Sequence, residues 1–204
     1  MSAAAAQRAR LPLFPLHSVL LPGGVLPLRI FETRYLDMVR DCLREGRGFG
    51  VCLIETGKEV GSPPRIFTVG TLARIVDWDQ RADGLLGIVA RGERRFRVHE
   101  REARRNGLLY GEVEWLADVP DDETVGMPDD YRELAELLQR LVRELGAPFT
   151  LFPDELYGQP GWVGSRLTEL LPLAPQLRQT LVEFDDGQER LRRIGELLRG
   201  GRFG

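Results

Sequence analysis

The chain has 204 residues, of which 43% are hydrophobic, and its formal net charge is −3. This length allows one large domain or two small ones, and the apolar content is sufficient for a real core. The charge is uneven: residues 1–116 carry 18 basic and 14 acidic side chains (net +4), whereas residues 117–204 carry 10 and 17 (net −7). Neither half has the strong basic excess of a dedicated nucleic-acid-binding domain.

The ends and the cysteines place further bounds on the class of protein. Cys42 and Cys52 are too few for a disulfide scaffold and are expected to be buried thiols. No apolar run approaches the ~20 residues of a membrane-spanning helix, so no membrane association is expected. The start, MSAAAAQRAR, lacks the apolar core of a secretory signal. We therefore expect a cytoplasmic protein with a flexible tail over residues 1–9.

The stretch 11–35 is expected to run strand, turn, strand and helix start. Its first half holds three prolines: Pro12, Pro15 and Pro22. They exclude a helix interior, and Pro22 with the two glycines that follow it predicts a turn. The apolar run Val25–Ile30 predicts the second strand. Glu32 or Thr33 is expected at the helix start, where an oxygen side chain or a negative charge satisfies free backbone N–H groups.

Short apolar and alternating segments fill the rest of the first half. A helix is expected over residues 33–46, followed by strands over 49–54, 66–77, 85–90, 94–99 and 108–116. Asp83-Gly84 and Asn106-Gly107 predict the turns between neighbouring strands. Many short strands with turn signals and one early helix indicate a small closed or nearly closed β-barrel. Periodicity alone does not choose among barrel types.

The second half is expected to be helical. Residues 118–128 are an acidic segment with proline and glycine, which predicts a linker between domains at 10–117 and 129–200. Four helices are expected beyond it: one that ends at Gly146, two over about 162–171 and 175–184, and a last one. The pairs Asp130 with Glu133, and Asp186 with Glu189, have the spacing of a helix-start capping pair.

Three stretches of sequence resemble a known family. The run PLFPL…VLLPG…LPLRIFETRY, with FTVGTLA at 67–73 and GERRFRV at 92–98, resembles the N-terminal, substrate-binding domain of Lon proteases. The resemblance covers roughly residues 10–200. It implies an α+β fold, in which a PUA-like β pseudobarrel with one early helix precedes a C-terminal helical cluster.

The resemblance also implies a function. Full-length Lon carries an ATPase and a Ser–Lys protease after this region, and this chain ends at Gly204, so we expect a stand-alone bacterial member without either. Its expected role is to bind exposed or unfolded polypeptide segments as an adaptor to a protease or chaperone. Such a role needs a shallow apolar surface with a few polar anchors.

The residues themselves offer no catalytic constellation. Neither a G-x-x-x-x-G-K-[ST] phosphate loop nor a G-x-S-x-G elbow occurs in the sequence. Lys58, the only lysine, lies in an expected loop, which argues against a Ser–Lys dyad. His17 and His99, the only histidines, stand at no metal-ligand spacing from each other or from a cysteine. We therefore expect no enzyme activity, no metal and no cofactor.

Two segments are the candidate walls of a polypeptide-binding groove. The helix start Glu32, Thr33 and Arg34 is expected at the barrel rim, where free N–H groups can receive an acceptor. An aromatic loop is expected to supply the other wall: Phe149, Phe152, Tyr157 and Trp162. An alternative stays open, in which the helix start is only a cap and the aromatics close a small core.

A basic run supports an alternative function. Its arginines are Arg94, Arg95, Arg97, Arg101, Arg104 and Arg105. They could contact RNA phosphates, since PUA-like barrels include RNA binders. Interspersed glutamates, and the lack of exposed aromatic residues for base stacking, favour a solvated hairpin face, with Phe96 pointing inward. Nucleic acid is therefore the less favoured partner.

Overall fold

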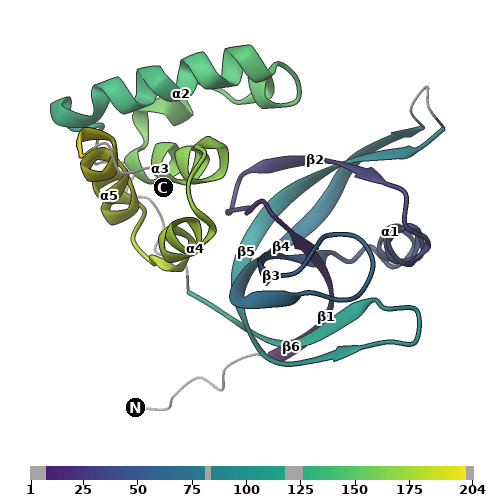
Figure 1. The fold of residues 1–204 in the computed structure, drawn as a ribbon. Coiled ribbons are helices and arrows are strands. Elements are labelled where there is room, and N and C mark those ends of the chain that lie inside the picture. Colours follow the sequence, from purple (N-terminus) through teal and green to yellow (C-terminus); the bar gives the residue numbers. More distant parts are fainter. Residues whose placement is uncertain (1–7, 81–83, 118–125, 201–204) are drawn as a thin grey trace, which may run out of the picture.

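The computed structural model describes residues 8–80, 84–117 and 126–200, which form a β-barrel and a helical cluster (Figure 1). The barrel strands are β1 (Arg8–Leu16), β2 (Val25–Ile30), β3 (Phe49–Thr56), β4 (Arg65–Gln80), β5 (Leu86–Ala103) and β6 (Leu109–Trp115). Arg8 and Ala9, expected in the flexible tail, begin β1; residues 1–7 lie outside the described chain. The expected linker also falls mostly outside it.

The sheet closes on itself through its longest strand. The strand order is β2-β5-β4-β3-β1-β6, and β5 also pairs with β6, so β5, β4, β3, β1 and β6 form a ring. The β1–β3 pair is parallel and the other pairs are antiparallel. β2 lies outside the ring and pairs only with the first half of β5. The expected barrel is therefore confirmed, with β2 as an added edge strand.

Strand β5 is continuous where two strands were expected, at 85–90 and 94–99. At the expected break, Gly92 exchanges backbone hydrogen bonds with the turn that precedes β2, donating to Gly24 (3.0 Å) and accepting from Gly23 (2.9 Å). A Cβ on Gly92 would collide with the carbonyl oxygen of Leu21, so only glycine permits this close approach. The glycine thus keeps the strand paired and does not end it.

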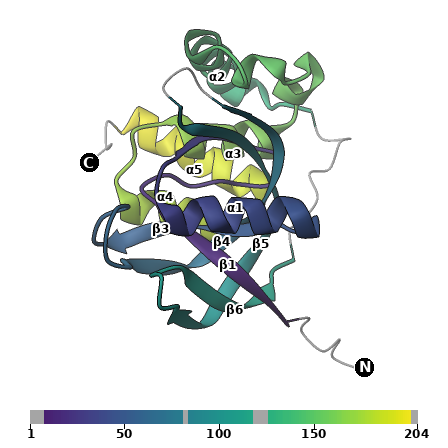
Figure 2. The same ribbon diagram turned by 90° about the vertical axis from the view of Figure 1, so that its right-hand side faces the viewer.

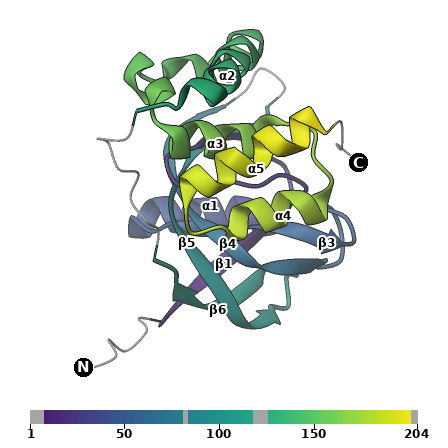
Figure 3. The ribbon, with the colours of Figure 1, turned by 90° about the vertical axis from the view of Figure 1, so that its left-hand side faces the viewer.

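Helix α1 (Thr33–Glu45) packs its apolar face on the barrel and ends at Gly46, whose φ of 62° is left-handed. The remaining helices are α2 (Arg132–Leu145), α3 (Pro160–Leu170), α4 (Pro175–Glu183) and α5 (Gly187–Arg199). Short 3₁₀ turns occupy Asp129–Tyr131, Phe149–Leu151 and Asp154–Gly158. α1 lies nearest the viewer in Figure 2 and α3 to α5 lie nearest in Figure 3, so they cover opposite sides of the barrel.

Of the two expected capping pairs, one supplies an N-cap residue. Asp186 begins α5, and its carboxylate accepts the N–H groups of Gln188 and Glu189. The prediction for Asp130 and Glu133 is wrong, because a 3₁₀ turn precedes α2 and no side chain caps it. The 3₁₀ turn satisfies the end of this helix with backbone bonds instead, as in the bond from Tyr131 N–H to Pro128 O at 2.9 Å.

Buried arginines join the barrel to the helices. Arg166 of α3 donates to the carbonyl oxygens of Leu21 and Pro22 at 3.3 and 3.1 Å. Its partner Glu169 accepts the Leu21 N–H at 2.6 Å. An apolar cluster that includes Leu21 also contains Val182 of α4. The helices are therefore held against the barrel by desolvated hydrogen bonds as well as by apolar packing.

Candidate functional site

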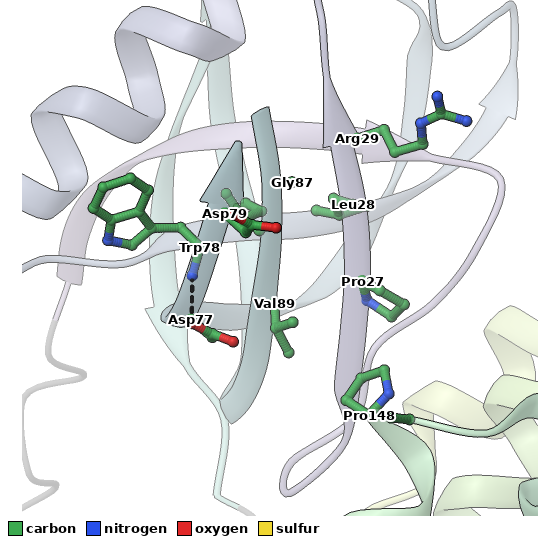
Figure 4. A pocket seen from close by; sticks show the side chains of 11 residues that line it. Pro27, Leu28, Arg29, Asp77, Trp78, Asp79, Gly87, Val89 and Pro148 are labelled. Carbon is green, nitrogen blue, oxygen red and sulfur yellow. Dashed lines mark hydrogen bonds between the residues drawn. The ribbon is translucent and has the colours of Figure 1, made fainter. Parts of the chain in front are cut away.

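A hollow of about 600 Å³ lies between the barrel and the loop that follows α2. Its floor is a three-stranded arm made by residues 27–29 of β2, 87–89 of β5 and 77–79 of β4, and Ala147 and Pro148 form its wall. Figure 4 shows Pro148 close to Pro27, at one end of the arm. The hollow is thus built jointly by the two halves of the chain, and such junctions are where ligands are commonly bound.

The strand register decides which side chains reach the hollow. Two rows cross the floor: Pro27, Val89 and Asp77 in one, and Arg29, Gly87 and Asp79 in the other. Opposed residues in paired strands project from the same face, and so do residues two apart on one strand. The intervening Leu28 and Ile88 face the barrel core. The floor is therefore apolar near Pro148 and acidic along β4.

A break in the register of β4 places the acidic groups. Ile75 pairs with Ala90 and Asp77 with Val89, so Val76 is an inserted residue. Without this insertion Trp78 would face the hollow; with it, Asp77 and Asp79 do. Trp78 instead projects away from Pro27, Val89 and Pro148 (Figure 4), so it reaches only the rim of the hollow, and 60% of its surface is accessible. An exposed tryptophan at the rim of a hollow is a typical binding feature.

The outer edge of β2 limits how a ligand can bind. β2 is an edge strand, which could in principle pair with an added strand from a ligand. Pro27 stands in its middle and has no N–H to donate, which is how natural edge strands resist such pairing. Recognition at this hollow therefore has to come chiefly from side-chain contacts.

The expected site at the helix start lies elsewhere. Glu32 precedes α1 without a side-chain cap and pairs with Arg34 at 2.9 Å. Arg34 is buried, and it donates to the carbonyl oxygens of Gly107 (3.0 Å) and Glu59 (3.4 Å). Thr33 is exposed as the first residue of the helix. Arg34 thus ties the helix to two barrel loops, which matches the packing part of the alternative, whereas no side chain caps the helix start.

The aromatic loop packs on the helical core. Phe152 and Tyr157 each meet the ring of Trp162 edge-on, with centroids 5.1 Å apart, and Trp162 is buried. Phe149 is partly buried against the same core. Phe152 and Tyr157 also border a smaller hollow of about 320 Å³ beside α2. These residues mainly close the core, although Phe149 directly follows Pro148 of the main hollow.

The two expected walls do not meet. α1 lies on the side of the barrel opposite the helical cluster, as Figures 2 and 3 both show. The helix start is bonded to Gly107 and Glu59 through Arg34. The aromatic loop instead packs on Trp162. A single groove bordered by both segments is therefore not formed.

The basic run is divided by the structure. Arg95 is entirely buried and donates to the carbonyl oxygens of Val182 (2.8 Å) and Phe184 (2.9 Å), so its prediction as a phosphate contact is wrong. Two exposed arginines of the run lie on aromatic rings, Arg94 on Trp115 at 4.5 Å and Arg104 on Tyr110 at 4.2 Å.

The remaining arginines of this run are exposed: Arg97, Arg101 and Arg105. Arg101 also donates to the carbonyl oxygen of Ile66 at 3.4 Å. Phe96 is fully buried in the barrel, as expected. Five of the six arginines are therefore exposed, and only Arg95 is withdrawn from the surface.

The cysteines and histidines have local partners. Both thiols are buried and free, and burial raises the pKa of Cys42 to about 11 and that of Cys52 to about 12. His99 lies 2.6 Å from Glu114, and the backbone of His17 bonds to Glu59 and Arg178. Within the described ranges, no three His, Cys, Asp or Glu residues gather as a metal site would need.

The length and polarity of the helices bear on whether any of them could span a bilayer. Across the described part of the chain, none is long and apolar enough to span a membrane.

Sequence reasoning missed the main hollow. Its most visible signal is the tetrapeptide Asp77-Trp78-Asp79-Gln80, in which an exposed tryptophan is flanked by two acids at the end of a long strand. The facing residues come from β2 and from Pro148, which are far away in sequence. Only the tertiary structure brings these three segments together.

Comparisons with known proteins agree on one family. The family model described as the ATP-dependent protease La (LON) substrate-binding domain matches residues 10–200. Lon protease of Anaeromyxobacter dehalogenans is 27% identical over 93% of this chain, and Lon protease 2 of Myxococcus xanthus is 28% identical over 92%. The chain spans 23% of the length of each of these two proteins.

Solved structures give the same result. A Lon N-terminal domain protein from Xanthomonas campestris is 45% identical, with a TM-score of 0.69, and the match covers 91% of this chain and 96% of that one. The N-terminal domain of a Mycobacterium avium complex Lon protease shares the fold at 20% identity, with a TM-score of 0.58 and the same coverage. The chain, with its barrel and its helical cluster, therefore belongs to the LON substrate-binding domain family.

Proposed function

We propose that this protein binds exposed apolar segments of unfolded polypeptide in the hollow between the β2–β5–β4 arm and Pro148, and that it does so without cleaving them. One observation carries the proposal: a hollow of about 600 Å³ whose floor is apolar near Pro148 and acidic along β4, with an exposed tryptophan at its rim, in a member of a substrate-binding family. The bound segment would be passed to a protease or chaperone, for which this chain serves as the adaptor.

The shape and chemistry of the hollow suit an extended segment. Pro27, Val89 and Pro148 give an apolar surface on which branched or aromatic side chains can dock. Trp78 at the rim offers a large apolar area with few rotatable bonds, so little conformational entropy is lost on binding. A shallow site of this kind selects apolar character and extension, not one sequence, which is what recognition of unfolded chains requires.

Titration of a fluorescein-labelled unfolded protein, reduced and carboxymethylated α-lactalbumin, tests the proposal by fluorescence anisotropy. Val89→Ser should weaken binding by roughly tenfold, since a central apolar anchor contributes about 1–2 kcal/mol, and Trp78→Ala, at the rim, should weaken it less. The matched control is Val60→Ser, because Val60 is also exposed (53%) but lies in the loop between β3 and β4. It should bind as the unaltered protein does.

Thermal melts of all three variants show whether the fold is intact. Equal affinity of Val89→Ser, Trp78→Ala and the unaltered protein would place the site outside this hollow. Cleavage of the labelled protein by the purified chain, abolished by a single serine substitution, would contradict the non-catalytic part.

A further inference from the structure

The charges of the hollow point to a narrower class of ligand. Resting on the proposed function, we infer that the hollow selects apolar polypeptide segments that carry a lysine or arginine next to their apolar residues. The basic side chain would bind along β4, between Asp77 and Asp79, while its apolar neighbours occupy the floor at Val89, Pro27 and Pro148.

The two carboxylates are positioned and available. Asp77 and Asp79 lie on the same face of β4, so their Cα atoms are about 7 Å apart, a span that a single guanidinium or ammonium group can lie between. Both are exposed, and no cation of the described residues forms an ion pair with either. One oxygen of Asp77 accepts the N–H of Trp78 at 2.9 Å (Figure 4), which orients the carboxylate and leaves its other oxygen for a ligand.

Arg29 makes the two sides of the hollow differ in charge. It stands in the same row as Asp79, but on β2, with β5 between them. Two strand spacings, about 9–10 Å, separate the two backbones. Arg29 has an interaction of its own and would repel a ligand cation from the β2 side. The acidic side therefore lies along β4, and two carboxylates there outnumber the one guanidinium.

The middle of the floor connects the acidic and the apolar sides. Gly87 lies between Arg29 and Asp79 and has no side chain, so the space above it is open from Val89 toward Asp79. A ligand side chain can cross this point, whereas Pro27 denies the ligand a backbone bond at the centre of β2. Selectivity is thus expected to arise from side-chain charge. The row Pro27–Val89–Asp77 supports this, because it places an apolar contact directly beside an acid.

Three labelled peptides with one unfolded, leucine- and valine-containing sequence test the inference. They differ only at two positions, which hold arginine, glutamine or glutamate. In 50 mM salt the arginine peptide should bind about fivefold more tightly than the glutamine peptide, since an exposed ion pair contributes up to about 1 kcal/mol. The glutamate peptide should bind weakest. In 1 M salt, where the Debye length is about 3 Å, the three affinities should converge.

The variant Asp77→Asn with Asp79→Asn should bind the arginine and glutamine peptides equally. Its matched control, Glu144→Gln with Glu155→Gln, removes the same charge from exposed residues outside the hollow and should keep the fivefold preference. This control separates a local site from the overall charge of the protein. Because all four acids are exposed, both double variants should have the melting temperature of the unaltered protein.

The outcomes separate the two proposals. If Val89→Ser abolishes binding but the arginine and glutamine peptides bind the unaltered protein equally, the site stands and the basic preference is wrong. The preference is also misplaced if the double asparagine variant keeps it. If no peptide binds and the labelled α-lactalbumin does not bind either, the proposed function falls and this inference falls with it.

Discussion

Arg95 of β5 and Asp185, between α4 and α5, form an ion pair of 2.9 Å in which the arginine is entirely buried and the aspartate is 69% exposed. The guanidinium passes from the barrel into the helical cluster, where it also bonds to the carbonyl oxygens of Val182 and Phe184. The ion pair and these carbonyl bonds are therefore expected to contribute unequally to the free energy of unfolding. The Val182 carbonyl oxygen depends on Arg95, and the Phe184 carbonyl oxygen accepts from both Arg95 and Arg190, whereas Asp185 has water as an alternative partner.

This asymmetry gives the first prediction. Arg95→Met should lower the free energy of unfolding by about 2–3 kcal/mol, because it removes a buried donor from the carbonyl oxygens of Val182 and Phe184, of which only the second keeps another arginine donor, Arg190. Asp185→Asn should lower it by less than about 1 kcal/mol, as for other exposed ion pairs. Urea unfolding followed by circular dichroism measures both. Equal losses in the two variants would show that the ion pair, not the carbonyl bonds, carries the stability.

Arg95 also shows what the sequence does not reveal. Alternation along a strand predicts that neighbouring residues face opposite sides, one of them solvent. Here Arg95 and Phe96 are both buried, because the barrel interior covers one face and the helices cover the other. Local pattern identified Phe96 as inward, but only the position of α4 reveals that Arg95 is covered too.

The elements themselves were largely predictable, because their signals are local. The apolar spacing of α1, the glycine that ends it and the cap at Asp186 all lie within one or two turns of the chain. The hollow was not predictable, since it depends on the register of three strands and an inserted residue at Val76. A one-residue change of register would have placed Trp78, and not the acids, in the hollow.

Glu169 gives a second prediction, on pH. Burial raises the pKa of its carboxyl above the ordinary value, although Arg166 and the Leu21 N–H act in the opposite direction. The folded protein therefore holds this proton to a higher pH than the unfolded chain does. As pH rises above about 4.3, the unfolded chain ionises first, and the free energy of unfolding falls. Below that pH both states are protonated and the effect is absent.

Urea unfolding of the unaltered protein and of Glu169→Gln, from pH 4 to pH 8, measures this contribution. The difference in unfolding free energy, unaltered minus variant, should become steadily less favourable as pH rises, until the folded-state pKa is passed. An exposed control, Glu155→Gln, gives the background. A difference that grows in favour of the unaltered protein with pH would mean that Arg166 and Leu21 outweigh burial.

A third prediction concerns the boundary between the two parts. The acidic segment 118–128, with its proline and glycine, should be the first site cut by a broad-specificity protease, because such segments open locally at little cost. The two products should remain together on a sizing column, since Arg166 and Glu169 bond to the turn before β2 and Arg95 bonds to α4. Mass spectrometry identifies the cut. A first cut within residues 66–98 would place the boundary elsewhere.

The last prediction decides between the two interpretations of the aromatic loop. Phe152 lies edge-on against Trp162 with its centroid 5.1 Å away and is partly buried, so its removal opens a gap over the helical core. Phe152→Ala should therefore cost about 2 kcal/mol, below the ~3–5 kcal/mol of a fully buried phenylalanine, and should lower the melting temperature by about 5 °C. Its neighbour Leu151 is 77% exposed, and Leu151→Ala should change stability by less than about 0.5 kcal/mol.

Calorimetry of both variants, alongside anisotropy with the labelled unfolded protein, separates packing from recognition. If Phe152→Ala melts like the unaltered protein and yet loses affinity, the loop is a binding surface and the expected wall at 149–162 returns. If it melts lower and binds normally under folded conditions, the loop closes the core and recognition belongs to the hollow beside Pro148.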